Sequence, residues 1–239
     1  MGKVGSTSLE NSIPFSIHLH RLYNIHHKHS FYSPRRKSLL HKILGSCFDT
    51  MRRTAIRRRK KIKIITLVRN LYDRNVSAFF QNFAFWIVQY SSKVTEETRK
   101  DSTSFVYEVF ENIFDHNYAF TWFDKELKKF TGIDIFEHEF NKQRGWQRIQ
   151  KGKYDILVVK LEALGTACEA IEDFAGVKLK LNHSNLSGYK WYASLYKDFK
   201  NNYIPSEEYL HKIYQSKISK HFYTEEETND FRQKALKKK

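Results

Sequence analysis

The stretch that most constrains the fold is residues 62–83, where a short run of branched apolar residues leads directly into an aromatic-rich segment. Residues 62–68 are too few and too branched for a buried helix, so they predict an interior strand of a parallel sheet. The chain then turns, and Asp73 falls in the first turn of a helix, facing the positive end of its dipole. We therefore expect Arg69 at the carboxyl end of a strand, where open α/β sheets bind ligands.

Ser77 lies eight residues after Arg69, early in the same helix, so the two side chains can share one anion. A guanidinium fork and a hydroxyl together suit a phosphate that is held in a fixed orientation. An ordinary junction between a strand and a helix could carry the same pair, and from these two residues alone that alternative stays open.

The first eight residues, MGKVGSTS, form a second candidate anion loop. Glycines let backbone N–H groups close around a phosphate, Lys3 adds charge, and the hydroxyls can cap the short helix expected at 9–13. The spacing is not that of the nucleotide-triphosphatase loop, because Lys3 precedes Gly5. A disordered tail is the alternative, and the pairing with VRNLYDRNVSAFF favours the loop.

GKVGSTS and VRNLYDRNVSAFF together resemble the two phosphate-binding elements of sulfotransferases that use 3′-phosphoadenosine 5′-phosphosulfate (PAPS). The resemblance implies that Arg69 and Ser77 hold the 3′-phosphate of this donor. It also implies that the first loop holds the 5′-phosphosulfate, through Lys3, Val4, Gly5, Ser6, Thr7 and Ser8.

Further along, GYKWYASLYKDF at 188–199 resembles the signature of a bacterial sulfotransferase-like group named for capsular polysaccharide synthesis. WFDKEL and DILVVKLEAL also resemble segments of bacterial sulfotransferases, so the resemblance covers nearly the whole chain. It implies that Lys190 and Trp191 help to close over the nucleotide. Packing of C-terminal helices against the sheet would explain Trp191 equally well.

The sequence departs from the family pattern at two places. Leu71 stands where the family usually has proline, which leaves the Arg69–Ser77 pair intact. The family also has a strand before the first loop, and the sequence from Met1 has no room for one. We therefore expect a single sulfotransferase-like domain over residues 1–239 that lacks its first strand.

The expected fold is an α/β, three-layer, P-loop-like parallel sheet flanked by helices, with a helical insertion near 91–130 and a helical C-terminal segment. Apolar and alternating runs predict strands at 14–22, 62–68, 133–136, 146–149 and 156–160. Helices are expected at 35–61, 72–90, 104–116, 118–130 and, interrupted at Pro205, from 183 onward. Glu162 is expected to be an acid at a helix start, with an acceptor contact as the alternative.

His18 and His20 are two residues apart on the strand expected at 14–22, so they point to one face. Two histidines at this spacing could bind zinc, but no acidic or thiol partner follows with suitable spacing. Histidines that are solvated or that cap a helix are a further alternative. The resemblance implies that a histidine here accepts the proton of the acceptor. His20, with His18 as the alternative, is the candidate base, and the scheme requires no metal.

The formal net charge of +16 favours polyanionic partners such as nucleotide phosphates, acidic glycans, nucleic acid or a membrane surface. The basic run between Arg52 and Lys63 could bind nucleic acid or act as a nuclear signal, but a solvated helix end is the favoured interpretation. No stretch is apolar enough to span a membrane, no signal peptide is visible, and two cysteines imply no disulfide framework. A cytoplasmic location follows, with an upstream membrane anchor left open and the oligomeric state undefined.

Together these features predict a PAPS-dependent sulfotransferase that moves the sulfuryl group to a hydroxyl or amine of an acceptor, which we expect to be a glycan. Lys3 and the loop N–H groups are expected to stabilise charge on the leaving phosphate, and His20 to act as general base. The alternative is a non-catalytic relative that binds a nucleotide or an acidic glycan. The position of Lys3 and the lack of a clear carboxylate for Mg²⁺ argue against the interpretation of the chain as a P-loop kinase.

Overall fold

The computed structural model divides the chain into two compact units, which we describe separately. The first unit comprises Met1–Val68 and Thr121–Leu181, and the second comprises Arg69–Phe120 and Asn182–Lys239. The structure describes residues 4, 9–17, 22–23, 39–90, 102–179 and 190–237.

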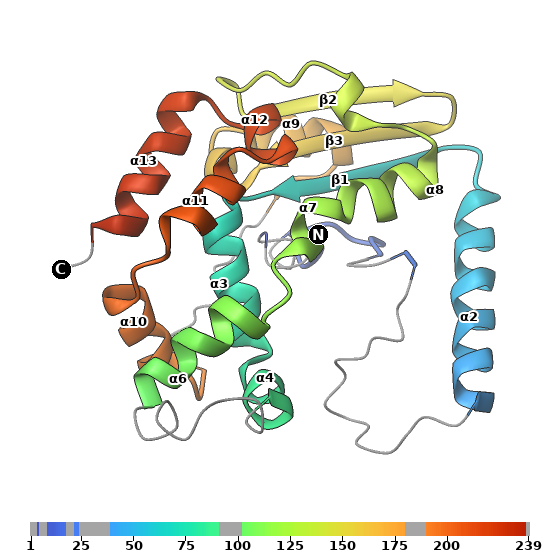
Figure 1. Cartoon of the computed structure of the whole chain (residues 1–239). Coiled ribbons are helices and arrows are strands. Elements are labelled where there is room, and N and C mark those ends of the chain that lie inside the picture. The colour runs from blue at the N-terminus through green and yellow to red at the C-terminus, as the bar shows by residue number, and fades with distance from the viewer. Residues whose placement is uncertain are drawn as a thin grey trace. The chain divides into compact units, whose positions relative to one another are not determined.

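The first unit contains a small sheet with helices around it (Figure 1). Its strands are β1 (Ile62–Val68), β2 (Trp146–Lys151) and β3 (Tyr154–Lys160). Its helices are α2 (Leu39–Arg57), η3 (Phe123–Lys128), α8 (Lys129–Thr131), η4 (Ile135–Glu137), η5 (Leu161–Ala163) and α9 (Cys168–Ala175). Helix α7 (Asn117–Trp122) crosses the boundary between the units.

Among the described residues the sheet has three strands in the order β1-β3-β2. β1 pairs with β3 in parallel, with Ile62 opposite Tyr154 and Val68 opposite Lys160. β2 pairs with β3 in the antiparallel direction. Only Gly152 and Lys153 separate β2 from β3, and Gly152 has a φ of 58°, so the connection is a tight hairpin, which imposes an antiparallel pair.

The predicted three-layer, P-loop-like parallel sheet is therefore wrong. The strand and the parallel pairing of residues 62–68 are confirmed, but β1 lies at the edge of the described sheet rather than in its interior. Residues 14–17 form turns and irregular chain instead of a strand, and the rest of the strand predicted at 14–22 is only partly described. The segment 133–136 is also not a strand, because Asp134 accepts a hydrogen bond from the N–H of Phe136 and begins the 3₁₀ helix η4.

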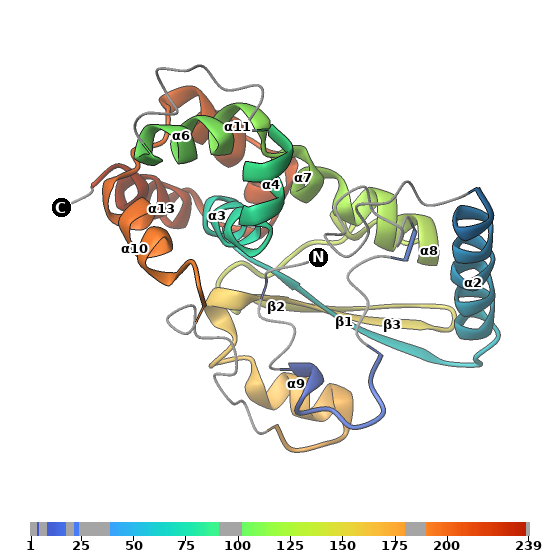
Figure 2. The same cartoon turned by 90° about the horizontal axis from the view of Figure 1, so that it is seen from below.

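Helices cover the sheet of the first unit. Figure 2 shows α9 on one side of β1 and α8 on the other. Lys63 links β1 to α9, because its Nζ donates a hydrogen bond to the carbonyl of Phe174 at 2.6 Å. Glu126 of η3 is 4% exposed and accepts hydrogen bonds from the N–H groups of Leu22 and Tyr23 at 2.6 and 2.8 Å. A buried carboxylate thus anchors part of the N-terminal segment.

The second unit consists of helices throughout its described part. They are α3 (Leu71–Gln81), α4 (Phe83–Tyr90), α6 (Ser102–Glu108), η2 (Val109–Ile113), α10 (Ala193–Asn202), α11 (Glu207–Tyr214), α12 (Lys217–Phe222) and α13 (Glu225–Leu236). The break predicted at Pro205 lies between α10 and α11. The helix predicted over 72–90 divides at Asn82, whose side chain donates to the carbonyl of Ala78.

Aromatic side chains form the core of the second unit. Phe79 is fully buried and its ring lies 5.1–5.7 Å from those of four phenylalanines on three segments, Phe80, Phe83, Phe110 and Phe114. Phe199 of α10 closes the cluster with centroid distances of 5.2 Å to Phe80 and Phe110. Edge-to-face contacts dominate, as expected from the ring quadrupoles. The aromatic-rich segment that follows β1 in the sequence therefore supplies core residues of this unit.

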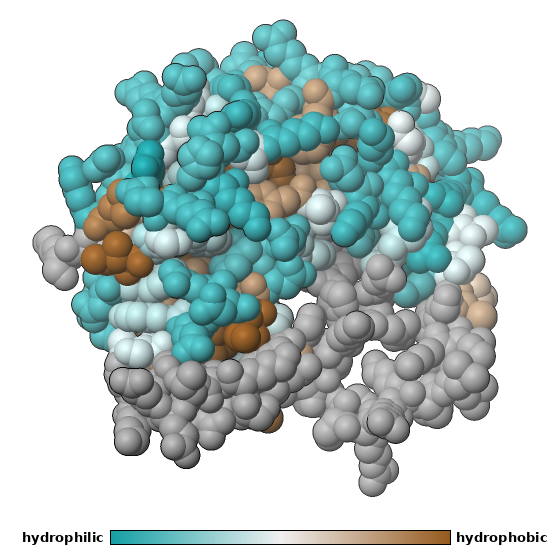
Figure 3. Space-filling model, viewed as in Figure 1, coloured by the Kyte–Doolittle hydropathy of each residue, from teal (hydrophilic) through white to brown (hydrophobic). Residues whose placement is uncertain are grey.

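Hydrophilic residues cover most of the described surface on the face shown in Figure 3. None of the helices within the described ranges combines the length and the apolar character needed to cross a membrane.

Candidate anion-binding site

Arg69, just before α3, contacts Ser77 in the middle of that helix, as their spacing predicts. The Arg69 guanidinium donates a hydrogen bond from Nη1 to the Ser77 hydroxyl oxygen at 3.1 Å. Both residues are half-buried. An arginine has five N–H donors in a planar fork, a geometry that suits bidentate contact with a phosphate.

Asn70, the residue after Arg69, is the N-cap of α3. Its side-chain oxygen accepts from the N–H of Tyr72 at 3.1 Å, and its carbonyl accepts from the N–H of Arg74 at 2.9 Å. The Asn70 amide also donates to the Asp73 carboxylate at 3.3 Å. Asparagine is a favoured N-cap, which explains why the helix begins here and why Arg69 stands at its positive end. The Asp73 carboxylate offsets part of that positive charge.

A buried polar network, which sequence reasoning missed, holds α3 inside the aromatic core. Asn75 is fully buried, and its amide nitrogen lies 3.4 Å from Nδ1 of His116 and donates to the Tyr209 hydroxyl at 3.2 Å. Nε2 of His116 lies 2.6 Å from the carbonyl of Phe110. Arg74 donates to the Asn75 side-chain oxygen at 2.9 Å, and its guanidinium lies over a tyrosine ring. The available signal was the run of three polar residues, Asp73 to Asn75, between apolar positions of α3.

Burial dominates the acid–base properties of this network. It lowers the pKa of His116 to about 4, against an opposing effect of the hydrogen bond to the Phe110 carbonyl. The neutral ring then donates from Nε2 to Phe110 and accepts at Nδ1 from Asn75. Burial also raises the pKa of Tyr209, so its hydroxyl stays protonated. These groups position α3 without adding charge to it.

Lys190 and Trp191 lie at the start of α10. Lys190 is exposed, and its carbonyl accepts from the N–H of Ala193 at 2.8 Å. Trp191 is 71% exposed, and its ring centroid is 6.0 Å from that of Phe83 and 5.5 Å from that of Tyr192. These contacts are with the helix α4 and with the neighbouring Tyr192, and not with the sheet that the packing alternative named. The large exposed ring face also leaves room for a stacked base, and that role stays a prediction.

Most of the first loop and both candidate bases lie outside the described residues. These are Lys3, Gly5, Ser6, Thr7, Ser8, His18 and His20. Val4 is described, is 1% exposed, and lines a cavity of the first unit. Residues 9–13 make one helical turn, with the N–H of Ile13 bonded to the carbonyl of Leu9 at 3.0 Å.

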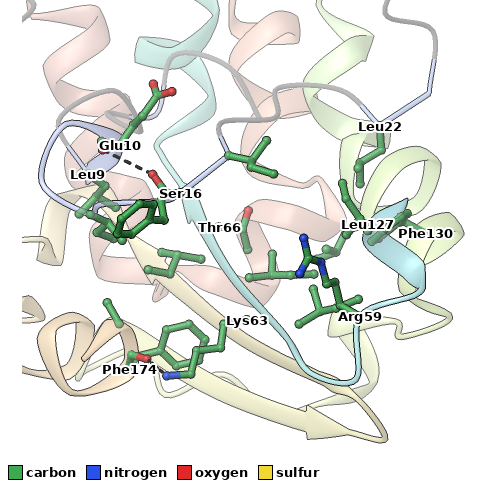
Figure 4. A pocket seen from close by; sticks show the side chains of 18 of the residues that line it. Leu9, Glu10, Ser16, Leu22, Arg59, Lys63, Thr66, Leu127, Phe130 and Phe174 are labelled. Atoms are coloured by element: carbon green, nitrogen blue, oxygen red, sulfur yellow. Dashed lines mark hydrogen bonds between the residues drawn. The ribbon is translucent and has the colours of Figure 1, made fainter. Parts of the chain in front are cut away.

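The cavity in the first unit measures about 560 Å³ and lies along β1 (Figure 4). Apolar side chains from several elements form its walls, among them Leu9, Leu22, Leu127, Phe130 and Phe174. Thr66 is 5% exposed, and its hydroxyl has no hydrogen-bond partner among the described residues. No role was predicted for this cavity from the sequence.

In the described part of the chain, no group of three or more His, Cys, Asp or Glu side chains could hold a metal ion. Glu162 lies in the first turn of η5 and is exposed, in keeping with its prediction as an acid at a helix start.

Comparison with protein-family models gives a match. The family model NKWYS, described as "Putative capsular polysaccharide synthesis protein", matches residues 96–224, which is more than half of the chain. The match includes the KWYAS segment that begins at Lys190. Neither a curated protein nor a solved structure matches the chain.

Proposed function

The chain belongs to the NKWYS family of capsular polysaccharide synthesis proteins, and we propose that it transfers a sulfuryl group from PAPS to a hydroxyl or amine of a capsular glycan. The observation that carries the proposal is the contact between Arg69 and Ser77. The family name supports the glycan as acceptor. The proposal rests on this local site and does not require the parallel sheet that the structure excludes.

The pair suits the 3′-phosphate that distinguishes PAPS from most adenine nucleotides. A phosphate has three terminal oxygens, and a guanidinium can contact two of them while the hydroxyl donates to the third. The Arg69–Ser77 hydrogen bond holds both groups in one place before an anion arrives. The buried Asn75–His116–Tyr209 network fixes the helix that carries Ser77, which limits the ordering cost of binding.

The chemical step that we propose is a direct in-line transfer. The acceptor oxygen forms a bond to sulfur while the bond between sulfur and the bridging phosphate oxygen breaks, and the electron pair goes to adenosine 3′,5′-bisphosphate. His20, or His18 in its place, takes the acceptor proton. Lys3 and the N–H groups of its loop stabilise charge on the leaving phosphate, which is commonly the largest contribution at such sites.

The test is sulfate transfer from ³⁵S-labelled PAPS to a desulfated glycan, with the variants Arg69→Ala and Ser77→Ala. We expect turnover by the wild-type chain and a large loss with both variants. Arg58→Ala is the matched control, because it removes one positive charge from an exposed position of the first unit, outside the proposed site. Nucleotide binding without any transfer would instead support the non-catalytic alternative, and equal turnover of Arg69→Ala and Arg58→Ala would exclude the proposed site.

A further inference from the structure

The helix α2 directs two of its arginines toward the rest of the first unit. The Arg53 guanidinium lies 4.7 Å from the ring centre of Tyr23. Nη2 of Arg57 donates to the Tyr23 hydroxyl at 2.9 Å and to the carbonyl of Phe130 at 3.3 Å. Asp49, one turn before Arg53 in the helix, is 9% exposed. Polar and charged side chains therefore hold α2 on the first unit.

The large apolar side chains of α2 lie on its other side. Phe48 is 67% exposed, Met51 is 66% exposed, and Ala55 is exposed as well. With 3.6 residues per turn, these three residues form one stripe along the helix, away from Arg53 and Arg57. A surface helix ordinarily packs its apolar stripe on the core and leaves its charged residues in solvent. The reversed orientation of α2 makes its outward stripe a candidate contact surface.

Exposed cations from two segments gather at the carboxyl end of α2. The N–H of Ile62 donates to the carbonyl of Lys153 at 2.8 Å, and Nζ of Lys153 donates to the carbonyl of Arg57. These bonds bring the hairpin between β2 and β3 next to the end of α2 (Figures 1 and 2). We define the basic end by four exposed cations at this place, Arg59, Lys60, Lys61 and Lys151.

The sequence around α2 has almost no negative charge. Residues 11–68 contain 14 of the 42 lysines and arginines of the chain but only one of its 26 acidic residues, Asp49. Residues 18–21 and 24–38, which lie outside the described ranges, contain neither aspartate nor glutamate, so their side chains cannot neutralise the basic end. A second copy of the chain bound through this surface would place like charges against each other. The partner that fits therefore combines negative charge with an apolar layer.

We propose that the outward stripe of α2 and the basic end bind the surface of a lipid bilayer that contains anionic phospholipids. Phe48 and Met51 enter the boundary between the headgroups and the acyl chains, and the basic end contacts the lipid phosphates. The apolar stripe favours a bilayer over nucleic acid or an acidic glycan, for which the cations alone would be enough. This surface belongs to the first unit, and the proposal does not depend on the proposed sulfuryl transfer.

The first experiment detects insertion of α2 directly. Cys47 is exposed and precedes Phe48, so the environment-sensitive dye NBD attached to Cys47 reports on the outward stripe, and Cys168→Ser removes the second thiol. The labelled full chain is mixed with vesicles of phosphatidylcholine, with vesicles that also contain phosphatidylglycerol, and with heparin. We expect a blue shift and at least about a twofold rise in emission with the anionic vesicles only.

Three outcomes of this experiment overturn the proposal. The absence of a response to the anionic vesicles, or an equal response to the neutral ones, excludes an anionic bilayer as the partner. The same response to heparin identifies a surface for polyanions in general. The same response on raising the protein concentration without vesicles identifies a second copy of the chain as the partner.

The second experiment measures the electrostatic part by co-sedimentation with the anionic vesicles. Removal of two charges in the double variant Lys60→Gln and Lys61→Gln should weaken binding about 25-fold, because each lysine near an anionic surface contributes about fivefold. The matched control is the double variant Lys197→Gln and Lys220→Gln, which removes two charges from exposed positions of the second unit. Equal affinities of the two double variants contradict the proposal.

The third experiment measures the apolar part in the same assay. The double variant Phe48→Ala and Met51→Ala should bind at least about tenfold more weakly, because less apolar surface enters the bilayer. The matched control, Val88→Ala with Ile204→Ala, changes positions of the second unit that are 73% and 60% exposed and should bind like the wild-type chain. Unchanged binding of the Phe48 and Met51 variant contradicts the proposal. If a variant fails to fold, the response of the Cys47 label decides alone.

Discussion

His116 makes the stability of the second unit depend on pH in a window that the structure defines. Its ring is buried among aromatic side chains, 4.8 Å from the ring of Phe110 and 4.5 Å from that of Tyr209. Protonation at Nδ1 would place an N–H against the amide of Asn75, which is itself a donor. Burial is the main cause of the lowered pKa, and the nearby Lys212 and Arg74 lower it further, whereas Asp115 acts in the opposite direction.

The magnitude follows from the two protonation equilibria. The pKa of His116 is about 4 in the fold and about 6.5 in the unfolded chain, so the unfolded chain binds the proton more readily between these values. The full contribution is present above pH 6.5 and is lost as the pH falls towards 4. This difference corresponds to about 3 kcal/mol, of which about 2.5 kcal/mol should be lost between pH 7.5 and pH 4.5.

The assay is urea unfolding of the wild-type chain and of His116→Gln across that pH range. Glutamine can still donate to the Phe110 carbonyl and accept from Asn75, but it does not titrate. Carboxylates elsewhere affect both proteins alike, so the difference between their pH profiles isolates His116. A difference below about 0.5 kcal/mol across the range, or titration of the His116 ring near pH 6.5, would refute the reasoning.

Three further substitutions test the packing of each unit. Phe79→Ala removes a fully buried ring and should lower the free energy of unfolding by about 3–5 kcal/mol in urea melts. The control Phe48→Ala, at a 67% exposed position, should change the free energy of unfolding by less than about 0.5 kcal/mol. Arg148→Ala breaks two hydrogen bonds of 2.8 and 2.7 Å to the buried Asp155 and should lower the midpoint of urea unfolding. The same change should raise the pKa of the Asp155 carboxyl, which the hydrogen bonds from Arg148 now hold below its usual value, and NMR titration would detect this. Glu126→Ala removes the acceptor of two backbone N–H groups, and we expect the amides of Leu22 and Tyr23 to exchange at least about tenfold faster, with no such change in Glu137→Ala.

The sequence was a good guide to the elements with strong local patterns. The branched apolar run at 62–68 and the one ending at Lys160 are both strands, and they pair in parallel. The helical segment expected at 118–130 ends close to the predicted boundary, at Gly132 with a φ of 76°. The prediction of the whole sheet failed because the pattern of one strand does not reveal how many partners it has. The tight turn at Gly152 makes β2 antiparallel to β3, and the sequence pattern did not predict this turn.

Contacts between residues far apart in the sequence also limited what could be predicted. The spacing of Arg69 and Ser77 correctly indicated that they could meet, because both lie within one strand–helix unit. The partners of Asn75 are 41 and 134 residues away in the sequence, so no local pattern links them. The π-helical segments η2 and η3 likewise follow from packing, since their sequences resemble those of ordinary helices.

The assignment of Arg69 and Ser77 to a 3′-phosphate is tested most directly by calorimetric titration with adenosine 3′,5′-bisphosphate and with AMP. These nucleotides differ in the 3′-phosphate, so the account predicts tighter binding of the bisphosphate to the wild-type chain. Arg69→Ala should weaken binding of the bisphosphate by about 1.5–3 kcal/mol, roughly 10- to 150-fold, and leave binding of AMP almost unchanged. Equal affinities of the wild-type chain for the two nucleotides would contradict the assignment.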